Sequence, residues 1–118
     1  MGSVQRRTAT ATIAINTALS GAVDLGHAAL CAIEMPTAWT TAALTFQGSH
    51  DGVTYQNIYD ANGEMSIAST IADASRDLAL NPVPFYGWRY LKIRSGTAAT
   101  AVNQAAARTL TLVVRDLA

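Results

Sequence analysis

The sequence predicts an all-β protein, a single antiparallel β-sandwich or barrel of seven to eight short strands. Several segments alternate apolar and polar residues with the period of two that is typical of strands. Turn dipeptides such as Asp51-Gly52 and Asn62-Gly63 separate these segments. The length of 118 residues fits one domain with one core. Short strands with turn signals between them are typical of sandwiches and barrels.

The clearest strand patterns lie near the two ends of the chain. Residues 8–15 read TATATIAI and residues 108–115 read RTLTLVVR, and both alternate. Every second side chain of a strand points to the same face, so both segments present one apolar face to a core. We therefore expect an N-terminal arm over residues 1–7 and a sandwich domain over residues 8–118.

The remaining segments follow from the same pattern. We expect strands at 27–35, 40–47, 53–59, 65–71 and 88–94, irregular links at 18–25 and 72–87, and a long loop at 95–107. Residues 27–35, HAALCAIEM, are apolar on both faces, and periodicity alone also allows a helix there. The side chains predicted to form the core are Leu44, Phe46, Leu91, Ile93, Leu110, Leu112 and Val114.

Composition limits the classes of partner. The formal net charge is zero and 14% of the residues are charged, against about 25% in a typical domain. Such a surface is not suited to steering nucleic acid, and low charge favours packing against other protein. Cys31 is the only cysteine, so an intrachain disulfide is excluded. Residues 1–7 lack the apolar segment of a signal peptide, and no run is long enough to span a membrane, so we expect no membrane partner and synthesis in a host cytoplasm.

Two polar stretches superficially suggest chemistry. Residues 48–52, GSHDG, resemble a hydrolase elbow but depart from G-x-S-x-G, so we interpret them as a turn. Residues 60–64, DANGE, contain oxygen ligands, but the glycine is not at the position that a helical-hand calcium loop requires. His27 and His50 have no partner at metal-ligand spacing. We therefore expect no catalytic residue, no metal and no cofactor.

One strand carries aromatic and basic residues in a row. Trp88, Tyr90, Lys92 and Arg94 fall on one face if residues 88–94 are regular. Such a row could stack on sugars or on single-stranded nucleic acid. Alternatively, Trp88 and Tyr90 cover the end of a thin core while Lys92 and Arg94 face solvent.

The turns and the penultimate strand also carry a family resemblance. Residues 49–55, SHDGVTY, and residues 88–94, WRYLKIR, are similar to the S-x-D-G-x-x-W/Y and R-Y-I-R-I signatures of discoidin-like, galactose-binding-like jelly rolls. Residues 88–114, with RYLKIRSGT and the closure VNQAAARTLTL, more closely resemble small β-sandwich structural proteins of tailed bacteriophages. This resemblance implies a jelly-roll-like sandwich and a structural role in the virion, such as capsid decoration or cementing.

Two functional hypotheses follow. The first is a non-enzymatic virion protein on the capsid surface that binds the major capsid protein or another virion protein and itself, as a dimer or trimer. The second is a carbohydrate-binding module or adhesin for a host glycan that uses Trp88, Tyr90 or Trp39 for stacking. The residues proposed for an interaction surface are Arg6, Arg7, Trp88, Tyr90, Asn103 and Gln104. The arm over 1–7 and the loop over 95–107 are expected to contact neighbouring subunits or the capsid.

Overall fold

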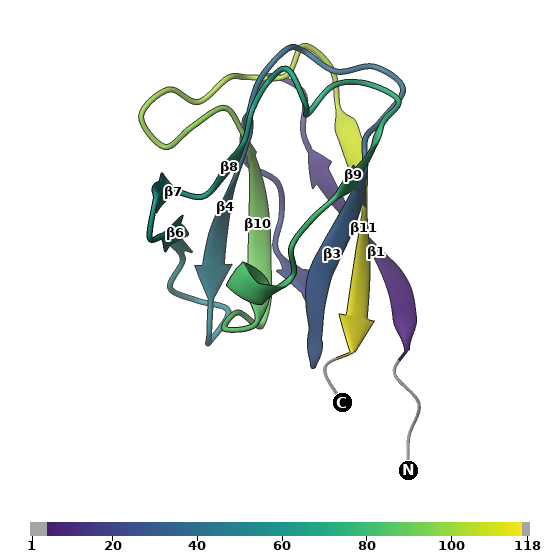
Figure 1. Ribbon diagram of the computed structural model, residues 1–118. Coiled ribbons are helices and arrows are strands. Elements are labelled where there is room, and N and C mark those ends of the chain that lie inside the picture. Colours follow the sequence, from purple (N-terminus) through teal and green to yellow (C-terminus); the bar gives the residue numbers. More distant parts are fainter. Residues whose placement is uncertain (1–4, 117–118) are drawn as a thin grey trace.

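The computed structural model describes residues 5–116 and has the shape of a two-layer sandwich (Figure 1). Its strands are β1 (Arg6–Ile13), β2 (Val23–Asp24), β3 (Ala28–Glu34), β4 (Leu44–Ser49), β5 (Gln56–Asn57), β6 (Tyr59–Asp60), β7 (Gly63–Glu64), β8 (Ser66–Ile67), β9 (Asp77–Ala79), β10 (Tyr90–Ser95) and β11 (Arg108–Asp116). A short 3-10 helix, η1, covers Val83–Phe85. In this part of the chain no helix is long and apolar enough to cross a membrane.

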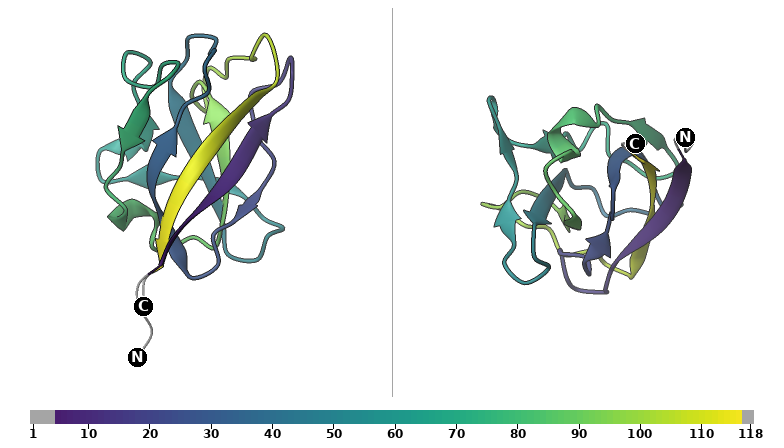
Figure 2. Two further views of the ribbon diagram at one scale, coloured as in Figure 1. Left: turned by 90° about the vertical axis from the view of Figure 1, so that its right-hand side faces the viewer. Right: turned by 90° about the horizontal axis from the view of Figure 1, so that it is seen from below.

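The chain passes back and forth between two antiparallel sheets. The first sheet has the order β1-β11-β3-β9, and the second has the order β2-β10-β4-β5, with β8 also paired to β4 (Figure 2). Alternation of successive strands between two sheets is the connectivity of a jelly roll. β5 and β8 pair with opposite ends of β4 and act as one interrupted edge strand, while β6 and β7 form a separate hairpin. The all-β sandwich predicted from the sequence is confirmed.

The two sheets bury the predicted core between them. All seven side chains predicted for this core are fully buried: Leu44, Phe46, Leu91, Ile93, Leu110, Leu112 and Val114. The register explains the match, because Ile93 pairs with Phe46 and Leu91 pairs with Gly48, so that these residues point to the same face of the second sheet. Phe85 of η1 adds an edge-to-face contact with Phe46, with ring centroids 5.2 Å apart.

The first strand is longer at its N-terminal end than predicted. β1 pairs with β11 in continuous register from Arg6 to Ile13, and Arg6 and Arg7 lie opposite Arg115 and Val114. The boundary predicted at residue 7 is therefore wrong for these two arginines, because backbone pairing with β11 extends the sheet over them. Residues 1–4 of the predicted arm lie outside the described residues.

Other boundaries differ for local reasons. The strand predicted at 53–59 is split into β5 and β6, because Ile58 is buried and its N–H bonds to the Phe46 carbonyl. The link predicted at 72–87 contains β9, where Leu78 pairs opposite Ile33. The link at 18–25 contains the two residues of β2. Residues 27–35 form a strand rather than a helix, and 96–107 form a loop.

Arg94 is buried, although one interpretation of the sequence placed it in solvent. Its guanidinium bonds to Thr45 Oγ1 at 2.9 Å, Asn57 Oδ1 at 3.0 Å and Glu64 Oε2 at 2.9 Å. The carboxylate of Glu64 also accepts the Ala98 N–H. A buried arginine needs such partners, because an unpaired charge in the interior is costly. The ion pair between Arg94 and Glu64 therefore holds the β6–β7 hairpin and the loop after β10 against the second sheet.

Gln104 is also buried, so its assignment to the interaction surface is wrong. Its side-chain carbonyl accepts the Thr40 N–H at 2.8 Å, and its amide donates to the Thr40 carbonyl at 3.0 Å and to Ser95 Oγ at 2.7 Å. These bonds hold the loop at 96–107 against residue 40 and the end of β10. The sequence shows a polar residue in a polar loop, but not this set of partners.

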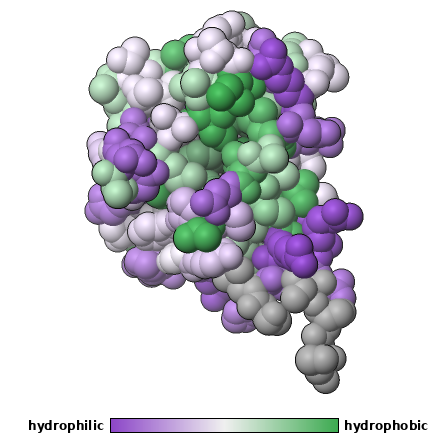
Figure 3. Space-filling view, in the orientation of Figure 1, coloured by the Kyte–Doolittle hydropathy of each residue, from purple (hydrophilic) through white to green (hydrophobic). Residues whose placement is uncertain are grey.

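A connection with apolar side chains covers one open side of the sandwich. Apolar surface runs down the middle of the face seen in Figure 3, with polar side chains on both flanks. The half-buried residues between positions 65 and 80 that pack against the core are Met65, Ile67, Ala74 and Leu80. The segment from Met65 to Leu80 thus extends a core in which leucine, isoleucine and aromatic side chains outnumber the alanines.

Candidate functional site

The GSHDG stretch forms a turn held by its own side chains. Asp51 Oδ1 accepts the N–H groups of Val53 at 2.8 Å and Thr54 at 2.9 Å, and the Ser49 hydroxyl lies 3.0 Å away. Ser49 Oγ in turn accepts the Gly52 N–H. Gly52 has a φ of +76°, a conformation that glycine adopts without strain. The interpretation of this stretch as a turn is confirmed. The side chains of Ser49 and Asp51 accept hydrogen bonds from the backbone N–H groups of the turn.

The Asp51 turn makes folding sensitive to acid. The N–H groups of Thr54 and Val53 lower the pKa of Asp51 to about 2. Because the folded pKa lies below the unfolded value, this carboxylate stabilises the fold above about pH 4, and the contribution is lost as the pH falls towards 2. We expect Asp51→Asn, which keeps an acceptor oxygen but does not titrate, to show a smaller decrease in Tm over this interval than the parent chain. Equal decreases in thermal melts at matched pH values would contradict the assignment.

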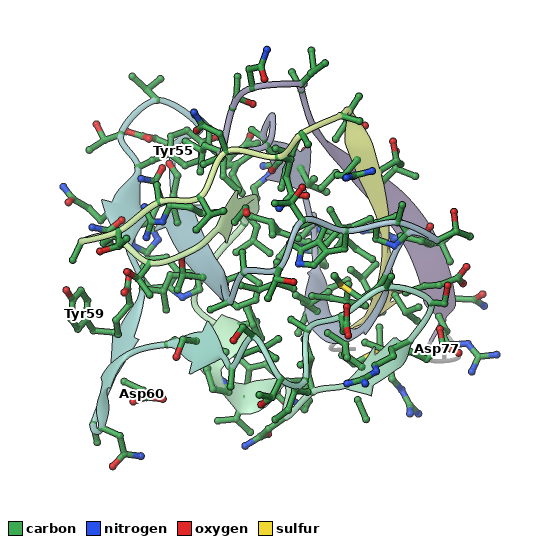
Figure 4. The ribbon with its side chains drawn as sticks, turned by 90° about the horizontal axis from the view of Figure 1, so that it is seen from above. Tyr55, Tyr59, Asp60 and Asp77 are labelled. Atoms are coloured by element: carbon green, nitrogen blue, oxygen red, sulfur yellow. The ribbon has the colours of Figure 1, made fainter. Side chains whose placement is uncertain are left out.

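The DANGE stretch is the β6–β7 hairpin rather than a ring of ligands. Asp60 Oδ1 accepts the Asn62 N–H at 2.8 Å, and Gly63 has a φ of +117°. Tyr59 points away from the body of the molecule (Figure 4), whereas Asp60 turns back to the hairpin backbone and Glu64 is bonded to Arg94. Among residues 5–116, no group of three or more His, Cys, Asp and Glu side chains is placed to hold a metal ion.

An open groove lies at the end of the sandwich where β11 ends. Its volume is about 870 Å³. Arg7 of β1, the turn before β3, the turn after β4 and the turn before β10 contribute to it. Its lining residues are Arg7, Gly26, His27, Ala28, His50, Tyr86, Gly87, Trp88, Arg89 and Asp116. We call this surface the terminal groove.

Trp88 lies at the centre of the contacts that shape the groove. Its indole packs against Gly48, where a Cβ would lie only 2.7 Å from the ring. His50 lies on the indole with a centroid separation of 5.0 Å and an angle of 36° between the rings. Trp88 is half-buried and packs against the core, while His50 and Tyr86 are exposed. The groove thus presents aromatic rings from separate turns on a rigid base.

The polar groups of the groove are held by fixed partners. Arg7 Nη2 donates to the Leu25 carbonyl at 2.6 Å, which joins β1 to the turn before β3. Arg89 forms a two-point ion pair with Asp24, with N–O distances of 3.2 Å. The bond from Arg89 and the Gly26 N–H lower the pKa of Asp24, so this pair is charged at neutral pH. Both arginines keep further N–H donors for a bound partner.

The expected row of aromatic and basic side chains is divided between two surfaces. β10 begins at Tyr90, so the period of two does not extend back to Trp88. Trp88 contacts Gly48, which pairs with Leu91, so Trp88 lies on the core side of the second sheet. Tyr90 instead packs over Gly52 on the outer face of that sheet. Arg89 lies 5.2 Å from the centre of the Tyr90 ring. Cations therefore already cover part of the outer aromatic surface, since Lys92 also lies 4.2 Å from the centre of the Tyr55 ring.

Comparison with known proteins identifies the fold without assigning a family. No protein-family model matches the chain, and no curated protein matches it. Among solved structures, the SPBc2 prophage-derived protein YomS matches 98% of this chain and 97% of its own, with a TM-score of 0.56 and 10% sequence identity. The C-terminal domain of a chitobiase from Bacteroides fragilis matches 80% of this chain and 60% of that chain, with a TM-score of 0.44 and 18% identity. The first likeness shows that a prophage-derived protein shares this fold over its whole length.

The structure brings together two of the predicted interaction residues, Arg7 and Trp88. Arg6 lies on the edge of the first sheet, and Asn103 is exposed in the loop at the end opposite the termini (Figure 1). Trp39 is buried, with its Nε1–H donated to the Ala42 carbonyl at 3.3 Å, so it is not available for stacking on a glycan.

Sequence reasoning did not find the other members of the groove. The sandwich brings three distant parts of the chain to the same end: His27, the turn that contains Tyr86 and Arg89, and Asp116. The one local signal was the aromatic and basic composition of residues 86–90, YGWRY. The assembled surface combines aromatic rings and arginines, which are enriched at the centres of protein interfaces.

Proposed function

We propose that this protein is a non-enzymatic structural protein of a phage particle that decorates or cements the capsid. The terminal groove docks on the major capsid protein or another virion protein, and the two sheets serve as a scaffold. The observation that carries the proposal is the clustering of Trp88, His50, Tyr86 and two arginines at one end of the molecule. Tryptophan, tyrosine and arginine are enriched among the few residues that dominate the binding energy of protein interfaces.

The rigidity of the groove supports a docking role. Trp88 packs against Gly48 and the core, Arg7 is tied to Leu25, and Arg89 is tied to Asp24. Side chains that are already ordered lose less conformational entropy when a partner binds. A preorganised aromatic and cationic end therefore suits attachment to a fixed surface that repeats around a particle.

The assignment to a phage particle rests on the fold and on the sequence. The prophage-derived YomS shares the fold across nearly the full length of both chains, at 10% identity. Residues 88–114 resemble small structural proteins of tailed phages. Neutral net charge and low charge content favour protein partners over nucleic acid.

The same groove provides a second candidate function. The half-buried indole of Trp88 and the exposed rings of His50 and Tyr86, beside polar and charged groups, also suit a sugar ring, so a role as an adhesin for a host glycan is the alternative. The stacking of His50 on Trp88 and the fixed Arg89–Asp24 pair are the observations that favour it. Trp39 and Tyr90 do not contribute to such a site, because the first is buried and the second lies outside the groove.

A binding experiment separates the two functions. Purified protein is added to particles that lack it, and bound copies are counted after sedimentation. We expect His50→Ala with Tyr86→Ala to reduce affinity about tenfold or more, because both side chains are exposed and truncation removes groove surface without opening the core. Tyr59→Ala is the matched control, since this exposed tyrosine lies on the β6–β7 hairpin outside the groove.

The outcomes are distinct. Wild-type binding to particles that is lost in the double variant and retained in Tyr59→Ala supports docking through the groove. Equal binding by all three proteins excludes the groove as the docking surface. Failure to bind particles, together with calorimetric binding to host surface polysaccharide that Trp88→Ala removes, establishes the glycan function instead.

A further inference from the structure

β1 is a long edge strand whose outer side is largely unpaired. Its eight residues pair with β11 on one side without a register shift (Figure 2). The other sheet edges are short, since β9 has three residues and β2, β5 and β8 have two each. Short strands and interruptions protect most edges against pairing with another chain, and β1 has neither.

The pairing pattern shows which backbone groups point outward. Asp116 N–H bonds to the Gln5 carbonyl, so the odd-numbered residues of β1 face β11. Arg6, Thr8 and Thr10 then direct their N–H and C=O groups to the open edge. Among residues 5–116, the one backbone bond on this side joins the Gly21 N–H to the Thr12 carbonyl at 3.3 Å. The free part of the edge therefore runs from Arg6 to Thr10 and is centred on Thr8.

We propose that this edge pairs with the same edge of a second copy of the chain, antiparallel across a twofold axis at Thr8. Thr8 then faces Thr8, and Arg6 faces Thr10 of the other copy. Each facing pair exchanges two backbone hydrogen bonds, and the first sheets of the two copies join into one continuous sheet. A twofold interface uses the same patch on both subunits, as this pairing requires.

Side-chain chemistry identifies a second copy as the occupant. The residues whose backbone groups point to the open edge are an arginine and two threonines, all exposed, and a twofold axis at Thr8 keeps the two Arg6 charges apart while it places threonine beside threonine. Pairing centred closer to Ile13 would collide with Gly21, which already occupies the edge at Thr12. The free outward groups are thus symmetric about one residue, which suits an identical strand in antiparallel orientation.

This inference goes beyond the proposed docking through the terminal groove and develops the self-association expected from the sequence. The terminal groove is lined by Arg7, whose backbone faces β11, and not by the outward groups of Thr8 and Thr10. Variants of β1 and variants of the groove therefore test the two interfaces separately.

Cysteine cross-linking tests the axis directly. In a Cys31→Ala background, Thr8→Cys should form a disulfide-linked dimer under mild oxidation, because facing residues of a hydrogen-bonded antiparallel pair have Cα atoms about 5.5 Å apart, within the range of a disulfide. Thr12→Cys is the matched control on the same strand and face, and it should cross-link at least tenfold more slowly. Equal rates for the two variants would overturn the proposed axis.

Sedimentation equilibrium without oxidant provides the second measurement. Thr8→Pro removes an N–H that points to the open edge, so it should leave the fold intact and weaken dimerisation at least tenfold, while Thr8→Val should dimerise like the parent chain. Retained dimerisation in Thr8→Pro, or a parent chain that stays monomeric at the highest soluble concentration, contradicts the proposal. Amide protection of β1 only when particles are added would also overturn it, in favour of a capsid strand as the occupant. If the monomeric Thr8→Pro protein still binds particles, the loss of dimerisation is independent of docking through the terminal groove.

Discussion

Leu112→Ala is expected to reduce the free energy of unfolding by about 2–5 kcal/mol, the range for truncation of a fully buried leucine. Leu112 lies on β11, the strand between β1 and β3, opposite Ala9 on one side and Ile33 on the other. Its side chain has no exposed surface. Because Leu112 belongs to the cluster of large buried side chains between the two sheets, a cavity here removes packing between the sheets.

The neighbouring residue supplies the control. Val113 is half-buried on the opposite face of β11, so Val113→Ala should cost about 1 kcal/mol or less. Urea unfolding followed by circular dichroism measures both values, and Leu91→Ala tests the second sheet in the same way. Unchanged melting temperatures for Leu112→Ala and Leu91→Ala would mean that the faces of the strands are assigned the wrong way round.

Gly96→Val is expected to destabilise the fold by about 3 kcal/mol or more, through backbone strain and direct overlap. Gly96 has a φ of +89°, a region that a β-branched residue rarely adopts. A Cβ at this position would lie 2.5 Å from the Thr100 carbonyl oxygen and 2.7 Å from the Val102 nitrogen. Both are backbone atoms, so relief requires the whole loop after β10 to move.

A second glycine tests whether overlap is the cause. Gly87 has nothing within 4 Å of an added Cβ and no positive φ, so Gly87→Ala should change stability by less than about 1 kcal/mol. Movement of the loop in Gly96→Val would also disturb the bonds of Gln104 to Thr40 and Ser95. Faster amide exchange at residues 96–104 in the folded variant would locate the damage. A melting temperature equal to that of the parent chain would contradict this account.

The strands with strict alternation could be predicted because their pattern is local. Residues 8–13 of TATATIAI and the whole of RTLTLVVR pair in the first sheet, and the seven predicted core residues are buried, whereas Ile15 lies beyond β1 and is exposed. Segments with short strands were less predictable. β9 has three residues in a stretch rich in small and polar side chains, and its pairing with β3 depends on a contact across more than forty positions.

Burial of polar groups required information that the sequence does not display. Arg94 looks like an exposed member of an alternating strand, but its partner Glu64 lies on a hairpin 30 residues earlier. The position of the hairpin decides the burial of both side chains. The burial of Gln104 is equally hidden in the sequence, because its hydrogen-bond partner Thr40 is 64 residues away.

The candidate site was predictable only in part for the same reason. Arg7 and Trp88 were selected for their residue types, and the terminal groove includes both. Nothing in the residues around His27 or Asp116 marks either of them as part of a binding surface. The ends of β1 and β11 meet the turn before β10 only when the two sheets are stacked, so no spacing in the sequence marks this surface.

A map of the intact particle, obtained by electron cryomicroscopy, is the most direct test of the proposed docking. We expect each copy of this protein to lie with Trp88, His50 and Tyr86 in contact with a capsid subunit, and the β6–β7 hairpin with Tyr59 away from that contact. A map in which the terminal groove faces solvent while another surface of the sandwich contacts the capsid, or a particle without this protein, would contradict the account.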